Sequence, residues 1–364
     1  MDLSKINKKL FKYIIILVVI LVVFVLVIGI IKLTGGSKLS YQKIEDKMKQ
    51  AAISYVKDKG AEFTLPSDNE IKTISVEDLV ANKNMKELSK YLKNDSVSCT
   101  GSVNVKKHDD YYLYIPNLDC GDDYQTMSLK DNIIKKGIVS SGDGLYYINN
   151  EYIFRGEYVN NYVKFANQIW RIIKIDSNGN IKLLQENSKE RNNWDNRYNI
   201  DFKSAVGINN YELSRVNQRL EELYDSIFDE EQKKYIATKD LCIGKRYAGD
   251  TTKDGVTECA ELSKNKKVGL IQINEFLMAS LDTNCQKIRD GACQNYNYLA
   301  KYNENWWSIT ANASKTSNVY EVIGGNTDTS NASVSKVLRL SIYLNDDVIY
   351  VSGDGTLENP YIFK

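Results

Sequence analysis

The sequence predicts an α+β protein with a transmembrane helix near its N-terminus and two folded parts behind it. Residues 13–31 form an apolar run without charge or proline. Residues 41–60 carry apolar side chains at helical spacing, and strand-like runs follow them. The rest of the chain, about 330 residues, is too long for one ordinary hydrophobic core, which favours two domains.

The apolar run, Tyr13–Ile31, has the length of a membrane-spanning helix. At about 1.5 Å per residue it would extend roughly 28 Å, close to the hydrocarbon thickness of a bilayer. A cleaved signal peptide and a core helix of a soluble protein are the alternatives, but the first has a shorter apolar core and the second is amphipathic. The flanking lysines favour a cytoplasmic N-terminus, because four precede the run and two follow it: Lys5, Lys8, Lys9 and Lys12 against Lys32 and Lys38. We therefore expect a cytoplasmic tail at 1–12, an uncleaved single-pass anchor at 13–32 in the cell membrane, and the remaining chain outside the cell.

Composition excludes some partners and cofactors. Lys and Arg total 48 against 47 Asp and Glu, so no charge excess points to nucleic acid. The single histidine, His108, excludes a histidine-based catalytic triad in the C-terminal domain and leaves a zinc site without its usual ligands. We expect no metal and no cofactor.

Six cysteines lie outside the apolar run, and none forms a C-x-x-C motif. Fifteen pairings are formally possible. Their positions fall into three local couples, Cys99 with Cys120, Cys242 with Cys259 and Cys285 with Cys293. Disulfides within these couples are the favoured interpretation, since an extracellular compartment permits them.

The segment 38–125 is expected to form a small α+β stem. Its helix should end at Gly60, and Ser75 or Asn84 should cap one of the short helices that follow. Two strands, 97–105 and 111–115, are joined by the polar turn KKHDD, and Cys99 and Cys120 would staple this hairpin.

This stem resembles the pilin-like stem of membrane-anchored surface proteins of Gram-positive bacteria. The resemblance rests on AAISYV at 51–56, ISVEDLV at 74–80, the C-x-G-x-V-x-V strand that begins at Cys99, and the Y-x-x-Y-I strand before Cys120. The prepilin cleavage site and the acidic residue of true pilins are missing from the apolar run. A stalk is therefore expected, and lateral assembly as a pseudopilin is the alternative.

Residues 126–150 are expected to be a linker, and residues 151–364 a second domain. The motif Ser-Gly-Asp-Gly occurs at 141–144 and again at 352–355, each time before a Tyr-Ile-Phe strand. We interpret both as hairpin turns, with a phosphate or calcium loop as the alternative.

The second domain shows a run of strand and helix signals in order. Strands are expected at 162–166, 169–175, 181–185, 318–324 and 337–344, helices at 212–228 and 229–239, and a strand leading into a helix at 268–280.

Residues 155–350 resemble the bacterial domain-of-unknown-function family 6273. The matching segments are Trp170-Arg171-Ile172, Ser214–Leu220, Asp229–Ile236, Leu270–Glu275, Trp306–Thr310 and Val337–Leu344. Two positions depart from the family pattern: the Trp306-Trp307 loop lacks its arginine, and Leu340 replaces a proline. The order of elements and the paired tryptophans are similar to C-type-lectin-like and sulfatase-modifying-factor domains, which implies a lectin-like α+β head.

Candidate chemistry in this domain is sparse. Asp250, Asp254, Asp282 and Asp328 lie in polar loops but lack recognisable calcium-ligand spacing. An aromatic ligand platform is a candidate, with core packing as the alternative, and would comprise Trp194, Trp306, Trp307 and Tyr320. Arg339 stands alone in an apolar strand and should pair with a buried acid or loop carbonyls.

The sequence thus predicts a non-catalytic, membrane-anchored surface protein that binds a glycan, a cell-wall polysaccharide or a protein. Two alternatives remain: a pseudopilin-like structural component, and a cysteine-dependent modifying enzyme that needs a free thiol.

Overall fold

The computed structural model describes residues 38–364, except residues 69 and 109–110. The chain divides after Thr126 into two compact units, each described by itself below. Both mix helices with antiparallel strands, so the α+β prediction is confirmed. No helix within the described ranges is long and apolar enough to cross a membrane. The predicted anchor at 13–32 lies outside these ranges.

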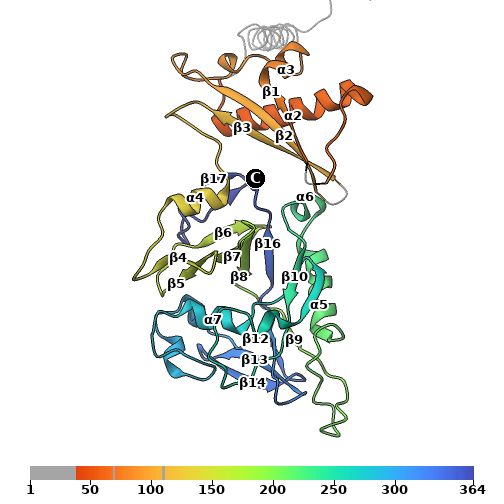
Figure 1. Cartoon of the computed structure of the whole chain (residues 1–364), viewed down its shortest axis with the longest axis vertical. Coiled ribbons are helices and arrows are strands. Elements are labelled where there is room, and N and C mark those ends of the chain that lie inside the picture. Colours follow the sequence, from red (N-terminus) through yellow and green to blue (C-terminus); the bar gives the residue numbers. More distant parts are fainter. Residues whose placement is uncertain (1–37, 69, 109–110) are drawn as a thin grey trace, which may run out of the picture. The chain divides into compact units, whose positions relative to one another are not determined.

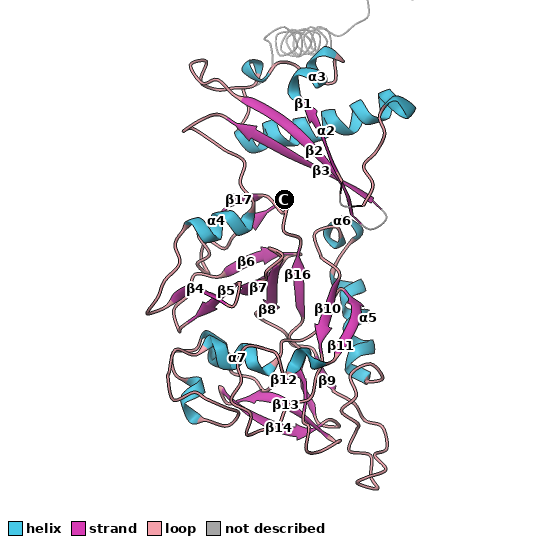
Figure 2. Ribbon diagram, viewed as in Figure 1, coloured by secondary structure: helices cyan, strands magenta, loops and turns pink. Residues whose placement is uncertain are grey.

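The first unit packs one long helix on a three-stranded antiparallel sheet (Figure 2). Helix α2 begins after Ser40, whose hydroxyl accepts a hydrogen bond from the Lys43 amide, and ends at Gly60, whose φ is +51°. The sheet order is β1-β2-β3, and Ser75 caps the short helix that follows β1. The elements are α2 (Tyr41–Lys59), η2 (Gly60–Glu62), β1 (Ile71–Ser75), α3 (Val76–Ala81), η3 (Leu88–Lys90), β2 (Thr100–His108) and β3 (Tyr111–Asp119).

The second unit contains two main sheets, and α7 (Ile273–Ala279) lies between them (Figure 1). The six-stranded sheet has the order β16-β8-β7-β5-β4, with β6 also paired to β7. Its strands are β4 (Gly144–Ile148), β5 (Glu151–Arg155), β6 (Tyr162–Phe165), β7 (Gln168–Ile175), β8 (Ile181–Gln185) and β16 (Ser341–Leu344). The five-stranded sheet has the order β14-β13-β12-β15-β9, with β9 (Arg191–Asn193), β12 (Trp306–Ala311), β13 (Asn318–Ile323), β14 (Asn326–Asn331) and β15 (Ser335–Val337).

Smaller elements complete this unit. Two two-stranded sheets pair β10 with β11 and β17 with β18. Their bounds, with those of the helices, are α4 (Leu129–Lys135), α5 (Arg215–Ile227), α6 (Glu230–Lys233), β10 (Lys239–Cys242), η4 (Glu258–Ala260), β11 (Leu262–Lys266), η5 (Gly291–Gln294), η6 (Tyr298–Lys301), β17 (Tyr350–Ser352) and β18 (Ile362–Phe363).

Several sequence expectations need correction here. The helix expected at 229–239 covers only Glu230–Lys233, and the strand expected at 337–344 is divided between β15 and β16. Residues 126–150 are not a plain linker, because they contain α4 and β4, and Leu129 and Ile133 are buried in the core of the second unit. The Leu129 amide also donates to the Val348 carbonyl, which ties this segment to the C-terminal part of the chain. The expected strand before α7 is only an isolated bridge between Gly269 and Ser341.

One face of the six-stranded sheet carries polar residues in two neighbouring rows. The strand register aligns Ile153, Lys174, Lys182 and Tyr343 in one row, and Tyr162, Arg171, Leu184 and Ser341 in the next. Lys182 and Leu184 are two residues apart, so their side chains lie on the same face. This face points toward α7, because Lys182 contacts Glu275 of that helix. The second unit therefore has charged groups where a purely apolar layer would be expected.

Candidate functional site

The four aromatic residues predicted as a ligand platform are all in the core. Trp194, Trp306, Trp307 and Tyr320 are each 0 % exposed. Three of them have a backbone carbonyl as acceptor: Trp194 at Ser308 (3.2 Å), Trp307 at Asn192 (3.2 Å) and Tyr320 at Arg246 (3.0 Å). The platform prediction is therefore wrong. Nothing in the sequence separates a buried tryptophan from a ligand-binding one, because both need a large rigid side chain.

The six cysteines form three disulfides: Cys99–Cys120, Cys242–Cys259 and Cys285–Cys293. These are the local couples that the spacing favoured. All six cysteines are among the described residues and none is free. A cysteine-dependent modifying enzyme would therefore lack its nucleophile in this structure.

The acidic turns have structural partners. Asp143, in the first Ser-Gly-Asp-Gly motif, accepts hydrogen bonds from the amides of Glu157 and Tyr158. Asp354, in the second motif, accepts from Thr356. No group of three histidine, cysteine or acidic residues within the described ranges is arranged to hold a metal ion.

The other acids of the polar loops have partners as well. Asp250 accepts hydrogen bonds from Thr252 and Thr257, and Asp282 accepts from Asn284 and Asn295. Asp328 pairs with Arg289 at 2.6 Å. Asp254 accepts from the Val256 amide and also lines the pocket described next.

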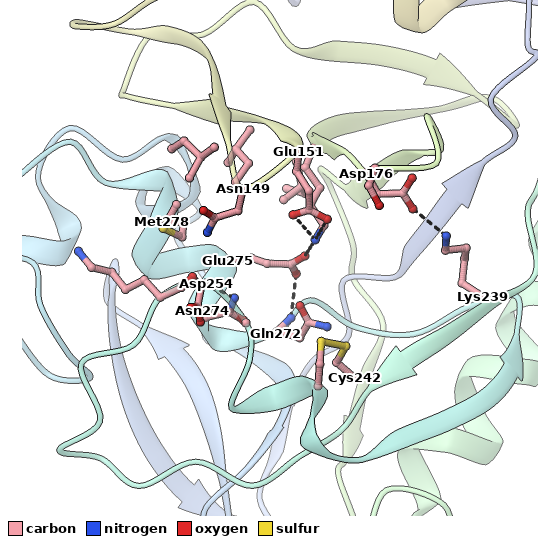
Figure 3. A pocket seen from close by; sticks show the side chains of 18 of the residues that line it. Asn149, Glu151, Asp176, Lys239, Cys242, Asp254, Gln272, Asn274, Glu275 and Met278 are labelled. Atoms are coloured by element: carbon pink, nitrogen blue, oxygen red, sulfur yellow. Dashed lines mark hydrogen bonds and ion pairs between the residues drawn. A yellow bond between two sulfur atoms is a disulfide. The ribbon is translucent and has the colours of Figure 1, made fainter.

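A pocket of about 350 Å³ lies between β5, β10 and α7 (Figure 3). The β7–β8 turn and the loop closed by the Cys242–Cys259 disulfide complete its wall. Its apolar part comprises Ile148, Ile153, Ile173, Leu241, Met278 and Tyr343. The sequence gave no signal for this pocket, because its lining residues are spread from position 148 to position 343 without a motif.

Three carboxylates at the pocket pair with lysines. Lys174 donates to both carboxylate oxygens of Glu151 at 2.9 Å, and its ammonium lies 3.9 Å from Glu275. Lys239 donates to Asp176 at 2.7 Å (Figure 3). The buried Lys182, beneath the pocket, pairs with Glu275 at 2.6 Å. The carboxylates of Glu151, Asp176 and Glu275 therefore already bind lysines of the protein itself.

Burial and pairing shift the two lysines of this row in opposite directions. Burial opposes the charge of Lys174, but the carboxylates of Glu275 and Glu151 outweigh it, so the pKa of Lys174 is raised. Burial dominates at Lys182, which is more deeply enclosed, and lowers its pKa in spite of Glu275.

Neutral amides supply the remaining hydrogen-bonding groups of the pocket. Asn149, Gln272 and Asn274 line it. Asn274 is only 5 % exposed, and its Nδ2 donates to the Lys253 carbonyl at 3.3 Å. Because a carbonyl only accepts, this bond sets the orientation of the amide. The other amide atom, Oδ1, is a buried acceptor with no donor within the part of the chain that the structure describes.

Lys253 occupies the same region of the pocket. Its ammonium donates to the Cys285 carbonyl and has no carboxylate at ion-pair distance among the described residues. Burial and the nearby Arg155 lower the pKa of Lys253, while Asp290 opposes them. The pocket thus combines carboxylates paired with lysines, the side-chain amides of Asn149, Gln272 and Asn274, and one lysine without a carboxylate partner among the described residues.

No family model, curated protein or solved structure matches this chain. The site is therefore interpreted from its own residues.

Proposed function

We propose that this protein is a single-pass membrane protein of the cell surface whose second unit binds a carbohydrate in the pocket between β5 and α7. Three disulfides support an oxidising, extracellular location for the described chain. The apolar run at 13–31 supports the membrane anchor.

The carbohydrate class follows from which groups the pocket leaves available. The carboxylates of Glu151, Asp176 and Glu275 already bind lysines, so they offer little attraction to a cationic ligand. Asn274 Oδ1 is the single observation that carries the proposal, because a buried acceptor without a donor costs roughly 1–3 kcal/mol. The atom has almost no accessible surface, so the proposal requires the Asn274 side chain to turn toward the pocket when a ligand donor binds. A sugar hydroxyl is such a donor, and the amides of Asn149 and Gln272 can bind further hydroxyls. The apolar side chains of the wall would contact the C–H faces of a sugar ring.

The proposal includes no catalytic step. A general acid or base needs a proton that exchanges near neutral pH. Glu151 and Glu275 instead form ion pairs with Lys174 and Lys182.

The resemblances to pilin-like stems, to domain-of-unknown-function family 6273 and to lectin-like heads belong to the same proposal. The first unit would act as a stalk, supported by its long helix on an antiparallel sheet closed by the Cys99–Cys120 disulfide. The second unit would be the binding head. Lateral assembly of the stem is the alternative, and filaments in negative-stain images of the full-length protein would favour it.

A glycan-binding screen tests the ligand class. The full-length protein, kept in a mild detergent, would be applied to an array of glycans and cell-wall polysaccharides. We expect selective binding that falls at least tenfold, about 1.4 kcal/mol, in the Asn274→Leu variant, which keeps the size of the side chain but removes the acceptor. Asn187→Leu is the matched control, because Asn187 is exposed and outside the pocket.

Two results would contradict the proposal. Binding that Asn274→Leu leaves unchanged would move the ligand site elsewhere, and no binding to any carbohydrate would exclude the ligand class. A separate experiment addresses location: protease added to intact cells should remove the second unit, and its full protection would exclude a cell-surface position.

A further inference from the structure

The second unit contains a buried arginine without a carboxylate partner. Arg171, on β7, is 5 % exposed, and its guanidinium forms no hydrogen bond or ion pair with the described residues. Its guanidinium stacks on two tyrosine rings, with Cζ 3.9 Å from the centroid of Tyr162 and 4.7 Å from that of Tyr298. Cation–π contacts of this kind stabilise the guanidinium but do not neutralise its charge.

A second arginine, Arg339, lies beside η6, the short helix that begins at Tyr298. Arg339 is 1 % exposed; its Nε donates to the Gln185 carbonyl at 2.8 Å, and its Nη2 donates to Glu186 at 3.0 Å. The sequence led us to expect a buried acid or loop carbonyls; the acid is instead partly exposed, and the carbonyl is that of the last residue of β8. The guanidinium also contacts two rings, with Cζ 4.3 Å from the centroid of Tyr302 and 5.0 Å from that of Trp306.

The fold brings the two guanidinium groups into one cluster. Arg171 is opposite Leu184 in the β7–β8 ladder, and Arg339 binds the carbonyl of the next residue, Gln185. Tyr298 begins η6 and Tyr302 follows its last residue, so one ring partner of each arginine belongs to this helical turn or its cap. Among the described residues, the two guanidinium groups have one carboxylate at ion-pair distance, that of Glu186.

Hydrogen-bond donors in this cluster also exceed acceptors. Four buried polar atoms have no partner among the described residues: Arg171 Nε, Arg339 Nη1, Tyr298 Oη and Trp306 Nε1. The arginine and indole nitrogens can only donate, and the tyrosine hydroxyl can donate as well. Trp306 therefore contributes an unpaired N–H group in addition to the ring that Arg339 contacts.

The Arg171 guanidinium therefore keeps a positive charge without a carboxylate partner inside the second unit, which is energetically unfavourable. The electrostatics agree with this description. Burial lowers the pKa of Arg339 to about 10, and Arg171 contributes to the decrease. Burial also raises the pKa of Tyr298, against the effect of Arg171. Water could accept the free hydrogen bonds but would not balance the charge, whereas an anion would do both.

We propose that a small monovalent inorganic anion of chloride size binds between Arg171 and Arg339. Its partners would be the free N–H groups of the two arginines and Trp306, with the Tyr298 hydroxyl as a further donor. The site is independent of the carbohydrate pocket, because none of these four residues lines that pocket. The anion would act as a structural ligand that stabilises the contact between β7, β8 and η6.

Thermal unfolding of the full-length protein in detergent tests the proposal. Sodium chloride or sodium bromide would replace sodium gluconate at constant ionic strength, and tryptophan fluorescence would report the transition. All four tryptophans, Trp170, Trp194, Trp306 and Trp307, lie in the second unit. A ligand that binds only the folded state raises the Tm with concentration. We expect Tm to rise with either halide over gluconate, and equal Tm values in all three salts would overturn the proposal.

An arginine variant separates specific binding from a general salt effect. Arg171→Met removes the unpaired charge, so the halide response should disappear while the protein stays folded in gluconate. Arg191→Met is the control, because Arg191 is exposed and pairs with Glu304 at the surface; its halide response should equal that of the parent protein. A halide response that persists in Arg171→Met would refute the site.

A direct measurement covers the case in which Arg171→Met does not fold. Crystals of the parent protein grown in bromide should show an anomalous peak within hydrogen-bond distance of both guanidinium groups. Water alone at this position would refute the proposal.

Discussion

The carboxylate of Glu275, on α7, accepts two hydrogen bonds from the ammonium of Lys182, on β8, at 2.6 and 2.8 Å. Both residues are buried, and the backbone N–H of Gln272 donates to the same carboxylate at 2.9 Å. This ion pair joins the six-stranded sheet to α7, which lines the pocket.

Breaking this pair from one side should destabilise the second unit. Lys182→Met leaves the Glu275 charge buried, with Lys174 only at 3.9 Å, and we expect a loss of about 3–5 kcal/mol. The double variant Lys182→Met/Glu275→Leu should recover most of that loss, because it removes both desolvated charges. Urea denaturation followed by tryptophan fluorescence measures both. A double variant no more stable than the single one would contradict this account.

The Cys242–Cys259 disulfide should support both stability and binding. It closes a loop of 17 residues, so replacing both cysteines by alanine should cost about 3 kcal/mol. The loop carries Lys253, Asp254 and Gly255 of the pocket wall, and carbohydrate binding should weaken with it. Alanines at Cys285 and Cys293, whose separation is 8 residues, are the control and should cost about 2.5 kcal/mol with less effect on binding. Equal binding losses in the two variants would argue against a specific role for the first loop.

Lys253 should titrate below the other lysines. Burial and Arg155 lower its pKa from the ordinary value of 10.5, whereas an ion pair with Glu157 raises that of Lys301. The unfolded chain therefore keeps the Lys253 proton to a higher pH than the folded protein, so this group makes the free energy of unfolding rise with pH between its folded pKa and 10.5. Reductive ¹³C-methylation and NMR would give both titration curves, and Lys253→Arg would assign the resonance. Coincident curves for Lys253 and Lys301 would refute the prediction.

The first unit depends on a hydrogen bond to a buried acid. Glu45 of α2 is 0 % exposed and accepts from the Tyr124 hydroxyl at 2.8 Å and from Thr126. Tyr124→Phe should cost about 1–3 kcal/mol and speed hydrogen exchange of the α2 amides, as measured by mass spectrometry.

Tyr41→Phe is the matched control for that variant. The Tyr41 ring stacks on Tyr124 at 4.7 Å, so this change removes a hydroxyl from the same ring pair but leaves the bond to Glu45 intact. Both variants keep the stacked rings, so equal acceleration of exchange in the two would contradict a specific role for the hydrogen bond to Glu45.

Much of the local structure could be predicted from the sequence. Helices α2 and α5 follow from apolar side chains at helical spacing, and Gly60 and Ser75 were recognisable as a helix end and a cap. The strands at β6, β7 and β8 follow from short apolar runs separated by turn residues. The cysteine couples could be proposed because each pair is close along the chain. These features depend on residues within about twenty positions of one another.

The sequence alone determined the α+β class, the candidate anchor and the local cysteine couples, because periodicity, length and spacing are properties of neighbouring residues. Only the tertiary structure decided that Trp194, Trp306, Trp307 and Tyr320 are core residues. Burial depends on which surfaces the fold brings together, and no local pattern encodes it. The same holds for Asn274 and Arg171, whose missing partners become visible only once strands and helices distant in sequence pack around them.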